Sequence, residues 1–298
     1  MLPEISAIGY TEFIMNWKMA VVLYVIVYSF SIILQKTLLK DDKSEVISRS
    51  IFFQLIVGLV LFVWALVNRC LDFGFDWSSV WIYLVVMTIL YGIGNVFIFK
   101  SLQVGSASSF SIYFSIRVFV TLVFTYFMFG QKFSIMSFVG LLGIIIGIII
   151  VDYLPDILKV SKCELLAILA AICVGSTNAF SQLVLKTVNL DTFLFYAYLT
   201  PGLFMMFIKP KTINNFRKYA TKNMLPRIVL LALTQAAAGI FFFHAIEVSN
   251  DSSLVTAVSL SSIVLTVILE FWLLKERDHF WRKLIAAVIT FGGLMLLV

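Results

Sequence analysis

The chain has 298 residues, of which 61% are hydrophobic and 13% charged, and it combines a formal net charge of +6 with a mean hydropathy of +1.04. Soluble domains are about half apolar and about one quarter charged, so this composition excludes an ordinary soluble protein and indicates a polytopic membrane protein. The positive charge does not indicate nucleic-acid binding, because the basic residues lie in links between apolar runs, where they normally set membrane orientation.

Apolar runs follow one another along the whole chain. Their lengths of about 17 to 25 residues suit an α-helix that crosses a hydrocarbon core of about 30 Å, and they lack the short alternation of a membrane β-barrel. Glu4 and Glu12 stand where a signal peptide has basic residues, so residues 1–16 are expected to form an N-terminal tail. The sequence predicts an all-α integral membrane protein with ten transmembrane helices, at residues 17–36, 50–68, 78–99, 106–129, 134–153, 162–186, 191–208, 225–246, 252–274 and 280–298.

The second half of the sequence repeats the first. A shift of 144 residues places Phe99-Lys100 on Phe243-His244. The same shift places Ser108-Ser109 on Ser252-Ser253. Five spans per half is an odd number, so we expect two inverted five-helix repeats around a central cavity, with a binding site near the midplane. The predicted repeats are residues 17–153 and 154–298.

The fourth predicted span carries Arg117 near its middle. A guanidinium at that depth costs a few kcal/mol or more unless it faces protein or a water-filled cavity, which makes it a functional-site hypothesis. Its planar fork can hold a carboxylate or phosphate with two parallel hydrogen bonds. Tyr113 and Thr121 fall on the same helical face. The alternative is structural: Arg117 and Glu270 would neutralise each other, and the hydroxyl groups would bond their own backbone.

Polar residues at helical spacing also occur in the first, third, sixth, eighth and ninth spans. Together with the fourth span, these six helices are expected to surround the cavity. The candidate substrate-binding residues are Arg117, Tyr113, Ser109, Thr121, Tyr91, Asn95, Tyr28, Asn178, Gln182, Gln235, Thr256 and Ser259. Glu270 is a candidate for proton coupling, because a buried carboxyl group can be tuned to exchange protons. His and Cys residues show no metal-ligand spacing, and we predict neither a metal nor a cofactor.

Each half ends with a turn and a glycine-rich last span. The residues concerned are Gly130-Gln131, Ser134, Gly140, Gly143 and Gly147 in the first half, and Lys275-Glu276 and Gly292-Gly293 in the second. With the span layout and the repeat, they resemble the EamA-type, ten-helix members of the drug/metabolite transporter superfamily, over nearly the whole chain. The chain differs from that family's pattern at Gln131, where glutamate is usual, and in lacking a proline within the fourth and ninth spans. The resemblance implies a central cavity between the two halves.

The function expected from the site and the resemblance is secondary-active transport by alternating access. The substrate would be a small amphipathic metabolite, such as an amino acid or a related anionic or zwitterionic compound, and the direction would be export or exchange. No P-loop is present, which argues against direct drive by ATP. A flippase for a lipid-linked precursor is an alternative, since it could use Arg117 for a phosphate. A membrane-embedded enzyme is less supported, because the two histidines lack convincing partners.

The expected partners are a small-molecule metabolite and the lipid bilayer, without nucleic acid, and the sequence leaves a homodimer open. The expected location is the cell membrane, which is the inner membrane if the source is Gram-negative. Most Lys and Arg residues outside the spans follow odd-numbered spans, which places both termini outside the cytoplasm. The family resemblance implies the reverse orientation, so the sequence leaves the orientation open.

Overall fold

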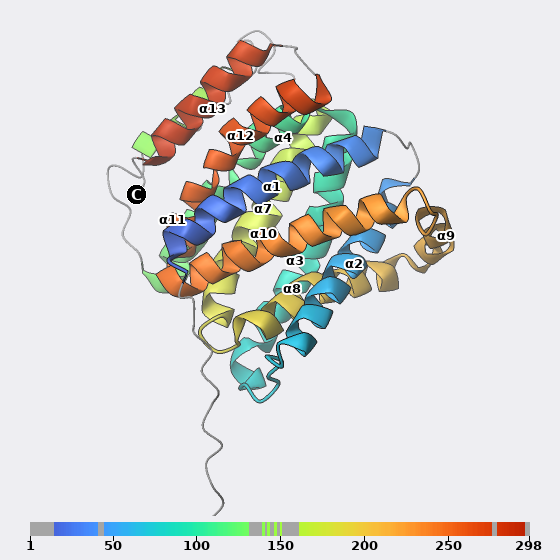
Figure 1. Cartoon of the computed structure of the whole chain (residues 1–298). Helices are drawn as coiled ribbons and strands as arrows, with labels where there is room; N and C mark the ends of the chain where they lie inside the picture. Colours follow the sequence, from blue (N-terminus) through green and yellow to red (C-terminus); the bar gives the residue numbers. More distant parts are fainter. Residues whose placement is uncertain are drawn as a thin grey trace, which may run out of the picture.

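The computed structural model of the chain describes residues 15–40, 45–130, 139–140, 142–143, 146–147, 150, 161–275 and 279–295. All regular elements in these ranges are helical (Figure 1). They are α1 (Trp17–Lys40), α2 (Val46–Val67), α3 (Trp77–Val104), α4 (Ala107–Phe114), α5 (Arg117–Phe129), α7 (Lys162–Val184), α8 (Leu190–Ile208), the 3-10 helix η1 (Pro210–Asn215), α9 (Phe216–Tyr219), α10 (Leu225–Ser249), α11 (Ser252–Ser259), α12 (Ser261–Leu269), the π-helix η2 (Glu270–Leu274) and α13 (Phe280–Met295).

Eight helical segments in the described part of the chain are long and apolar enough to cross a membrane. They correspond to the first four predicted spans and to the sixth through the ninth. The fifth predicted span, residues 134–153, lies largely outside the described residues, as do residues 1–14 of the predicted tail. The tenth begins as α13, which has 16 residues and is not among the eight. An all-helical, multi-pass membrane fold is thus confirmed, whereas the total of ten spans stays a prediction.

Polar side chains fix where several helices begin. The residues that precede a helix and accept a hydrogen bond from a backbone N–H of its first turn include Asp76, Ser161, Asn189 and Asp251. At α7 the cap is a full capping box, because Glu164 also accepts from the backbone N–H of Ser161. The first N–H groups of a helix have no partner within it, so these caps satisfy them where apolar helices begin.

The fourth and ninth predicted spans are each broken into two helices. Between α4 and α5, the Ser115 N–H bonds three residues back to the Ile112 carbonyl (3.1 Å), and the Leu260 N–H makes the equivalent bond between α11 and α12 (3.1 Å). Such bonds are 3-10 turns. The hydroxyl of Ser115 donates to the same Ile112 carbonyl (2.6 Å), and that of Ser259 donates to Thr256 (2.6 Å). Serine back-bonding of this kind accompanies both breaks, which lie in spans that contain no proline.

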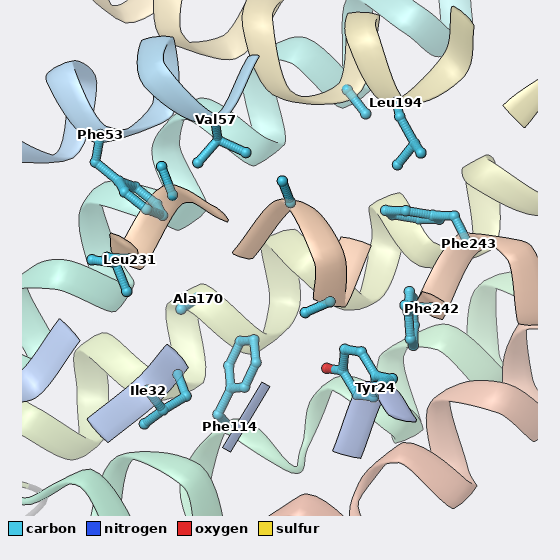
Figure 2. Packing of buried hydrophobic residues seen from close by; sticks show 14 of the residues in the cluster. Tyr24, Ile32, Phe53, Val57, Phe114, Ala170, Leu194, Leu231, Phe242 and Phe243 are labelled. Carbon is cyan, nitrogen blue, oxygen red and sulfur yellow. The ribbon is translucent and has the colours of Figure 1, made fainter. Parts of the chain in front are cut away.

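The first helix of each half packs against the third helix of the other half, and the two second helices pack together. α3 lies along α7, α1 lies along α10, as the blue and orange ribbons of Figure 1 show, and α2 packs on α8. Buried apolar side chains at these contacts form the main core (Figure 2). A Cβ on Gly143 would lie 2.6 Å from the Gly293 Cα, so glycine lets the last spans of the two halves meet closely. Many large apolar side chains stay exposed on the outside, as expected for a surface that faces lipid.

The link between α8 and α10 contains η1 and α9 and is fastened to the start of α2. Glu45 forms an ion pair with Lys209 (2.9 Å) and accepts a hydrogen bond from Asn215 Nδ2 (2.8 Å). Tyr219 donates its hydroxyl to the Glu45 carbonyl (3.1 Å). Lys209 and neighbouring donors hold the pKa of Glu45 below its ordinary value. Because the two charged side chains are 39% and 46% exposed, this pair adds little to stability.

Candidate functional site

A cavity of about 100 Å³ lies between the helices of the two halves. Its wall includes residues from α1, α2, α3, α4, α5, α7, α8 and α10. The polar and aromatic residues of the wall are Tyr24, Tyr28, Gln35, Phe53, Gln54, Tyr91, Asn95, Phe114, Arg117, Asn178, Tyr198, Gln235, Phe242 and Phe243. Arg117 is the one charged side chain among the described residues that form this wall.

Arg117 is held at the cavity by the break between α4 and α5. It is the first residue of α5, and Gly175 of α7 lies directly against its backbone, where a Cβ would be 2.5 Å from the Arg117 carbonyl oxygen. Glycine at that position therefore allows α5 and α7 to approach closely. Thr121 strengthens the same contact by donating its hydroxyl to the Gly175 carbonyl (2.9 Å). The backbone that carries Arg117 is thus fixed by packing and hydrogen bonding.

The guanidinium of Arg117 is surrounded by hydroxyl groups and aromatic rings. Its Nη2 donates to Ser259 Oγ (3.1 Å) and to the Tyr24 hydroxyl (3.4 Å). The charge lies over the rings of Phe114 (4.6 Å) and Tyr28 (5.5 Å), both within the range of cation–π attraction. Only 4% of the side chain is exposed. These neighbours orient the guanidinium, but none of them carries a negative charge.

Arg117 has no carboxylate partner among the residues that the structure describes. Its Nε is fully buried and makes no hydrogen bond within this part of the chain. Uncompensated burial of a charged donor is costly, so such a group is expected to gain from an anion brought into the cavity. This geometry does not support the structural alternative considered above, in which Glu270 would neutralise Arg117.

Glu270 lies in a separate buried cluster. Its Oε1 is 3.2 Å from Lys283 Nζ of α13, and its Oε2 accepts a hydrogen bond from the backbone N–H of Ser108 in the first turn of α4. Lys283 also donates to Ser106 Oγ (3.3 Å). Glu270 is 2% exposed and is absent from the described cavity wall. A carboxylate at a helix N-terminus is favourable, so the cluster ties η2 and α13 to α4.

Aromatic rings cover much of the space next to Arg117. Tyr24 stacks on Tyr28 with ring centroids 5.0 Å apart, and it contacts Phe242 at 4.9 Å. Figure 2 shows Tyr24, Phe114 and Phe242 around one region of the interior. This surface offers apolar and cation–π contacts together with phenol hydroxyl groups. It suits a ligand with an apolar or aromatic body.

Amide side chains contribute the remaining polar groups of the wall. Asn95 donates from Nδ2 to Ser50 Oγ (3.1 Å), which connects α3 to α2. Gln235 accepts from Ser31 Oγ (3.0 Å), which connects α10 to α1. Gln54 is 5% exposed, and its Oε1 has no hydrogen-bond partner among the described residues. The wall therefore combines one cation with several neutral hydrogen-bonding groups.

The structure brings about half of the predicted site residues to the cavity. Those that form part of its wall are Arg117, Tyr28, Tyr91, Asn95, Asn178 and Gln235. Those that lie elsewhere are Tyr113, Ser109, Thr121, Gln182, Thr256, Ser259 and Glu270. The prediction treated residues 106–129 and 252–274 as straight helices, and each 3-10 turn advances the chain by about 120° per residue instead of 100°. The break in the fourth span therefore turns the face of α4 that carries Ser109 and Tyr113 away from Arg117. It does not account for Thr121, which follows Arg117 within α5, or for Gln182, which lies in the unbroken α7.

Each displaced residue has a structural contact of its own. Ser109 takes part in the hydroxyl cluster at the start of α4, through Ser106. Gln182 accepts from the backbone and the hydroxyl of Ser252 (3.0 and 2.8 Å). Thr256 bonds back to its own helix and accepts from the cavity residue Asn178 (3.4 Å).

Tyr113 and Ser259, on the broken fourth and ninth spans, also lie outside the cavity wall. Tyr113 belongs to the apolar core. Ser259 touches the cavity only through Arg117. The prediction that these two side chains line the cavity is therefore wrong for both of them.

The second and seventh spans were not expected to reach the cavity, yet both do. Phe53 and Gln54 come from α2, whereas Ala197 and Tyr198 come from α8. No residue of α11 or α12 is part of the described wall, contrary to the expectation for the ninth span. Gln54 carried a usable signal, because it is the one amide within the apolar sequence of α2.

Metal binding has no support in the described part of the chain, where no three His, Cys, Asp or Glu side chains come together as a metal site. This observation concerns those residues alone. The cavity wall is instead built from aromatic, amide and guanidinium groups, which bind organic ligands through hydrogen bonds and ring contacts.

Comparison with known proteins identifies the family to which the chain belongs. The profile of the EamA-like transporter family matches residues 15–152 and again residues 161–298. A solved structure titled "Crystal structure of protein" shares 15% sequence identity, with a TM-score of 0.62 over 92% of this chain and 97% of the other, which shows a common fold. No curated protein matches the chain. This protein therefore belongs to the EamA-like transporter family, within the drug/metabolite transporter superfamily, as a multi-pass membrane protein.

Proposed function

We propose that this protein is a secondary-active transporter of small amphipathic metabolites that carry an anionic group, such as amino acids and related anionic or zwitterionic compounds. The observation that carries the proposal is Arg117, a buried cation on the cavity wall with no carboxylate partner among the described residues. A guanidinium in a low-dielectric cavity binds carboxylates and phosphates more strongly than it would in water. The substrate's anion would complete its coordination.

Alternating access would follow from two inverted repeats of five spans each. The reciprocal packing of α1 on α10 and of α3 on α7 supports this arrangement. Paired breaks in the fourth and ninth spans support it as well, because discontinuous helices at equivalent positions of two repeats are a feature of transporter binding sites. In this proposal ten spans enclose the cavity, the protein lies in the cell membrane, and transport serves export or exchange.

Matching contacts bound the cavity at its two ends. Lys36 follows the wall residue Gln35 on α1 and donates to the carbonyls of Leu102 (2.9 Å) and Gly105, at the end of α3. Gln182 lies one turn beyond the wall residue Asn178 on α7 and donates to the Asn250 carbonyl, at the end of α10.

In this proposal the two contacts would close the cavity, one in each half. Each joins the first helix of one repeat to the turn that precedes its broken helix. Alternate opening of the two closures would expose the cavity to one side of the membrane at a time.

The test is transport by the full-length protein in liposomes. Uptake of radiolabelled amino acids and aromatic carboxylates should be saturable for the native protein and should fall to background for Arg117→Leu. Arg217→Leu, the same change at an exposed position of α9, should transport like the native protein. Saturable uptake that is equal in all three proteins would exclude Arg117 as the anion site, and no saturable uptake of any anion would exclude this substrate class.

A further inference from the structure

The cavity wall also carries two glutamines, Gln35 and Gln54, that make no hydrogen bond with Arg117. Along α1, Tyr28 contacts the guanidinium, and the wall residue Gln35 lies seven residues further on, which is about 10 Å of helix rise. Arg49 of α2 donates to the Leu38 carbonyl of α1 (3.1 Å), which fixes the level of the two helices. Gln35 lies about 5 Å of helix rise from that contact and Gln54 about 8 Å, so both wall residues lie on neighbouring helices within two turns of it.

Gln54 has a fully buried side-chain carbonyl oxygen for which the described chain supplies no hydrogen-bond donor. Asn95 and Gln235 each have a serine partner, at 3.1 and 3.0 Å. Gln54 Oε1 is buried and has no such partner among the described residues, although the side chain is part of the cavity wall. Burial of an unpaired acceptor is unfavourable, and a site built around one rejects ligands that cannot supply a donor.

We propose that Gln54 forms a second recognition subsite, which accepts a hydrogen bond from a hydroxyl or amino group at the end of the substrate opposite its anion. The inference rests on the proposed function, because Arg117 must hold the anionic group. Beside the guanidinium the wall presents the rings of Tyr24, Phe114 and Phe242. The substrate class is therefore a small organic anion with an apolar or aromatic middle and a hydrogen-bond donor at its far end.

Two related classes of anion fit this arrangement less well. A purely apolar acid leaves the Gln54 oxygen unpaired. A dicarboxylate places a second acceptor beside that oxygen, and the described wall offers no second cation to hold it.

The experiment measures binding to the full-length protein in detergent by isothermal titration calorimetry. The probes are 3-phenylpropionate and 3-(4-hydroxyphenyl)propionate, which differ by one hydroxyl group. The native protein should bind the hydroxylated anion about tenfold more tightly. Gln54→Leu should lose about tenfold in affinity for the hydroxylated anion and stay within about twofold of native for the other. Gln103→Leu, the same change outside the described wall, should keep the native preference.

The outcomes separate this inference from the proposed function. One set of results would overturn the subsite and leave the proposed function standing. In it, both anions bind the native protein and Arg117→Leu loses that binding, but either the native protein shows no preference for the hydroxylated anion or Gln54→Leu keeps that preference. Binding that does not depend on Arg117, or no binding of either anion to the native protein, would overturn both. Should Gln54→Leu not fold, Gln54→Asn, which keeps an amide one methylene shorter, should reduce the preference about threefold; an undiminished preference would again exclude the subsite.

Discussion

Two buried charges, one in the fourth span and one in the ninth, behave differently. Arg117 in the fourth span meets hydroxyl groups and aromatic rings, and no described carboxylate lies against it. Glu270 in the ninth span meets the ammonium of Lys283 and a backbone N–H of α4. A charge that is matched within the chain holds helices together. A charge without a counter-ion beside a cavity is available to a ligand. The presence or absence of a counter-ion, rather than the degree of burial, therefore indicates the role of a buried charge.

The largest effect should come from breaking the matched pair. Glu270→Gln leaves Lys283, which is 13% exposed, without its counter-ion and should lower the free energy of unfolding by about 3–5 kcal/mol. The double variant Glu270→Gln/Lys283→Met removes both charges and should recover more than half of that loss. Thermal unfolding in detergent measures both. Equal stability of the native protein and both variants would show that the pair has no structural role.

Removal of the Arg117 charge should weaken anion binding without lowering stability, whereas removal of the Glu270 charge lowers stability. Arg117→Leu should weaken anion binding about 100-fold, equivalent to about 3 kcal/mol, without lowering the free energy of unfolding, because no partner loses its charge. Arg117→Lys keeps the charge without the fork and should lose about tenfold. Calorimetry and thermal unfolding of the same samples test this pattern. If Arg117→Leu unfolds as readily as Glu270→Gln, the contrast between the two charges is wrong.

A smaller effect should follow when the hydroxyl that orients Arg117 is removed. Ser259→Ala deletes an acceptor at 3.1 Å from Nη2 and should weaken anion binding about threefold to tenfold, or about 1 kcal/mol. Ser261→Ala is a matched control, since the Ser261 hydroxyl bonds back to the Val258 carbonyl (2.9 Å). The same calorimetric titration applies to both. Equal losses in the two variants would mean that the effect comes from the helix break and not from the contact with Arg117.

The smallest effect should come from the exposed pair of Glu45 and Lys209. The pKa of Glu45 is lower in the folded protein than in the unfolded chain, so its contribution is present above pH of about 4.5 and is lost as the pH falls through the folded value. Solvent screening limits this contribution to less than about 1 kcal/mol. The difference in unfolding free energy between the native protein and Glu45→Gln should shrink from about pH 6 to about pH 3. A difference that grows on acidification contradicts the assigned sign.

Sequence reasoning reached the membrane fold and the family but only part of the site. Arg117 could be found because a single charge within a long apolar run is a local signal. Tyr113 was placed on the cavity because residues 106–129 were treated as one straight helix, and the turn at Ser115 changes the direction in which α4 faces relative to α5. Thr121 was misplaced for another reason, because its hydroxyl bonds the Gly175 carbonyl of α7. Gln54 was missed although it is an isolated amide in an apolar helix, the same kind of signal that identified Arg117.

The sequence by itself determined that the chain forms apolar membrane helices, that its two halves are related, and that a cation lies deep within one of them. Only the tertiary structure decided that Lys283 neutralises Glu270, that Arg117 is left facing a cavity, and that α2 and α8 complete its wall. The physical reason is the range of the forces involved. Hydrophobic transfer depends on a window of neighbouring residues, whereas charge compensation and cavity shape depend on distances between atoms of different helices.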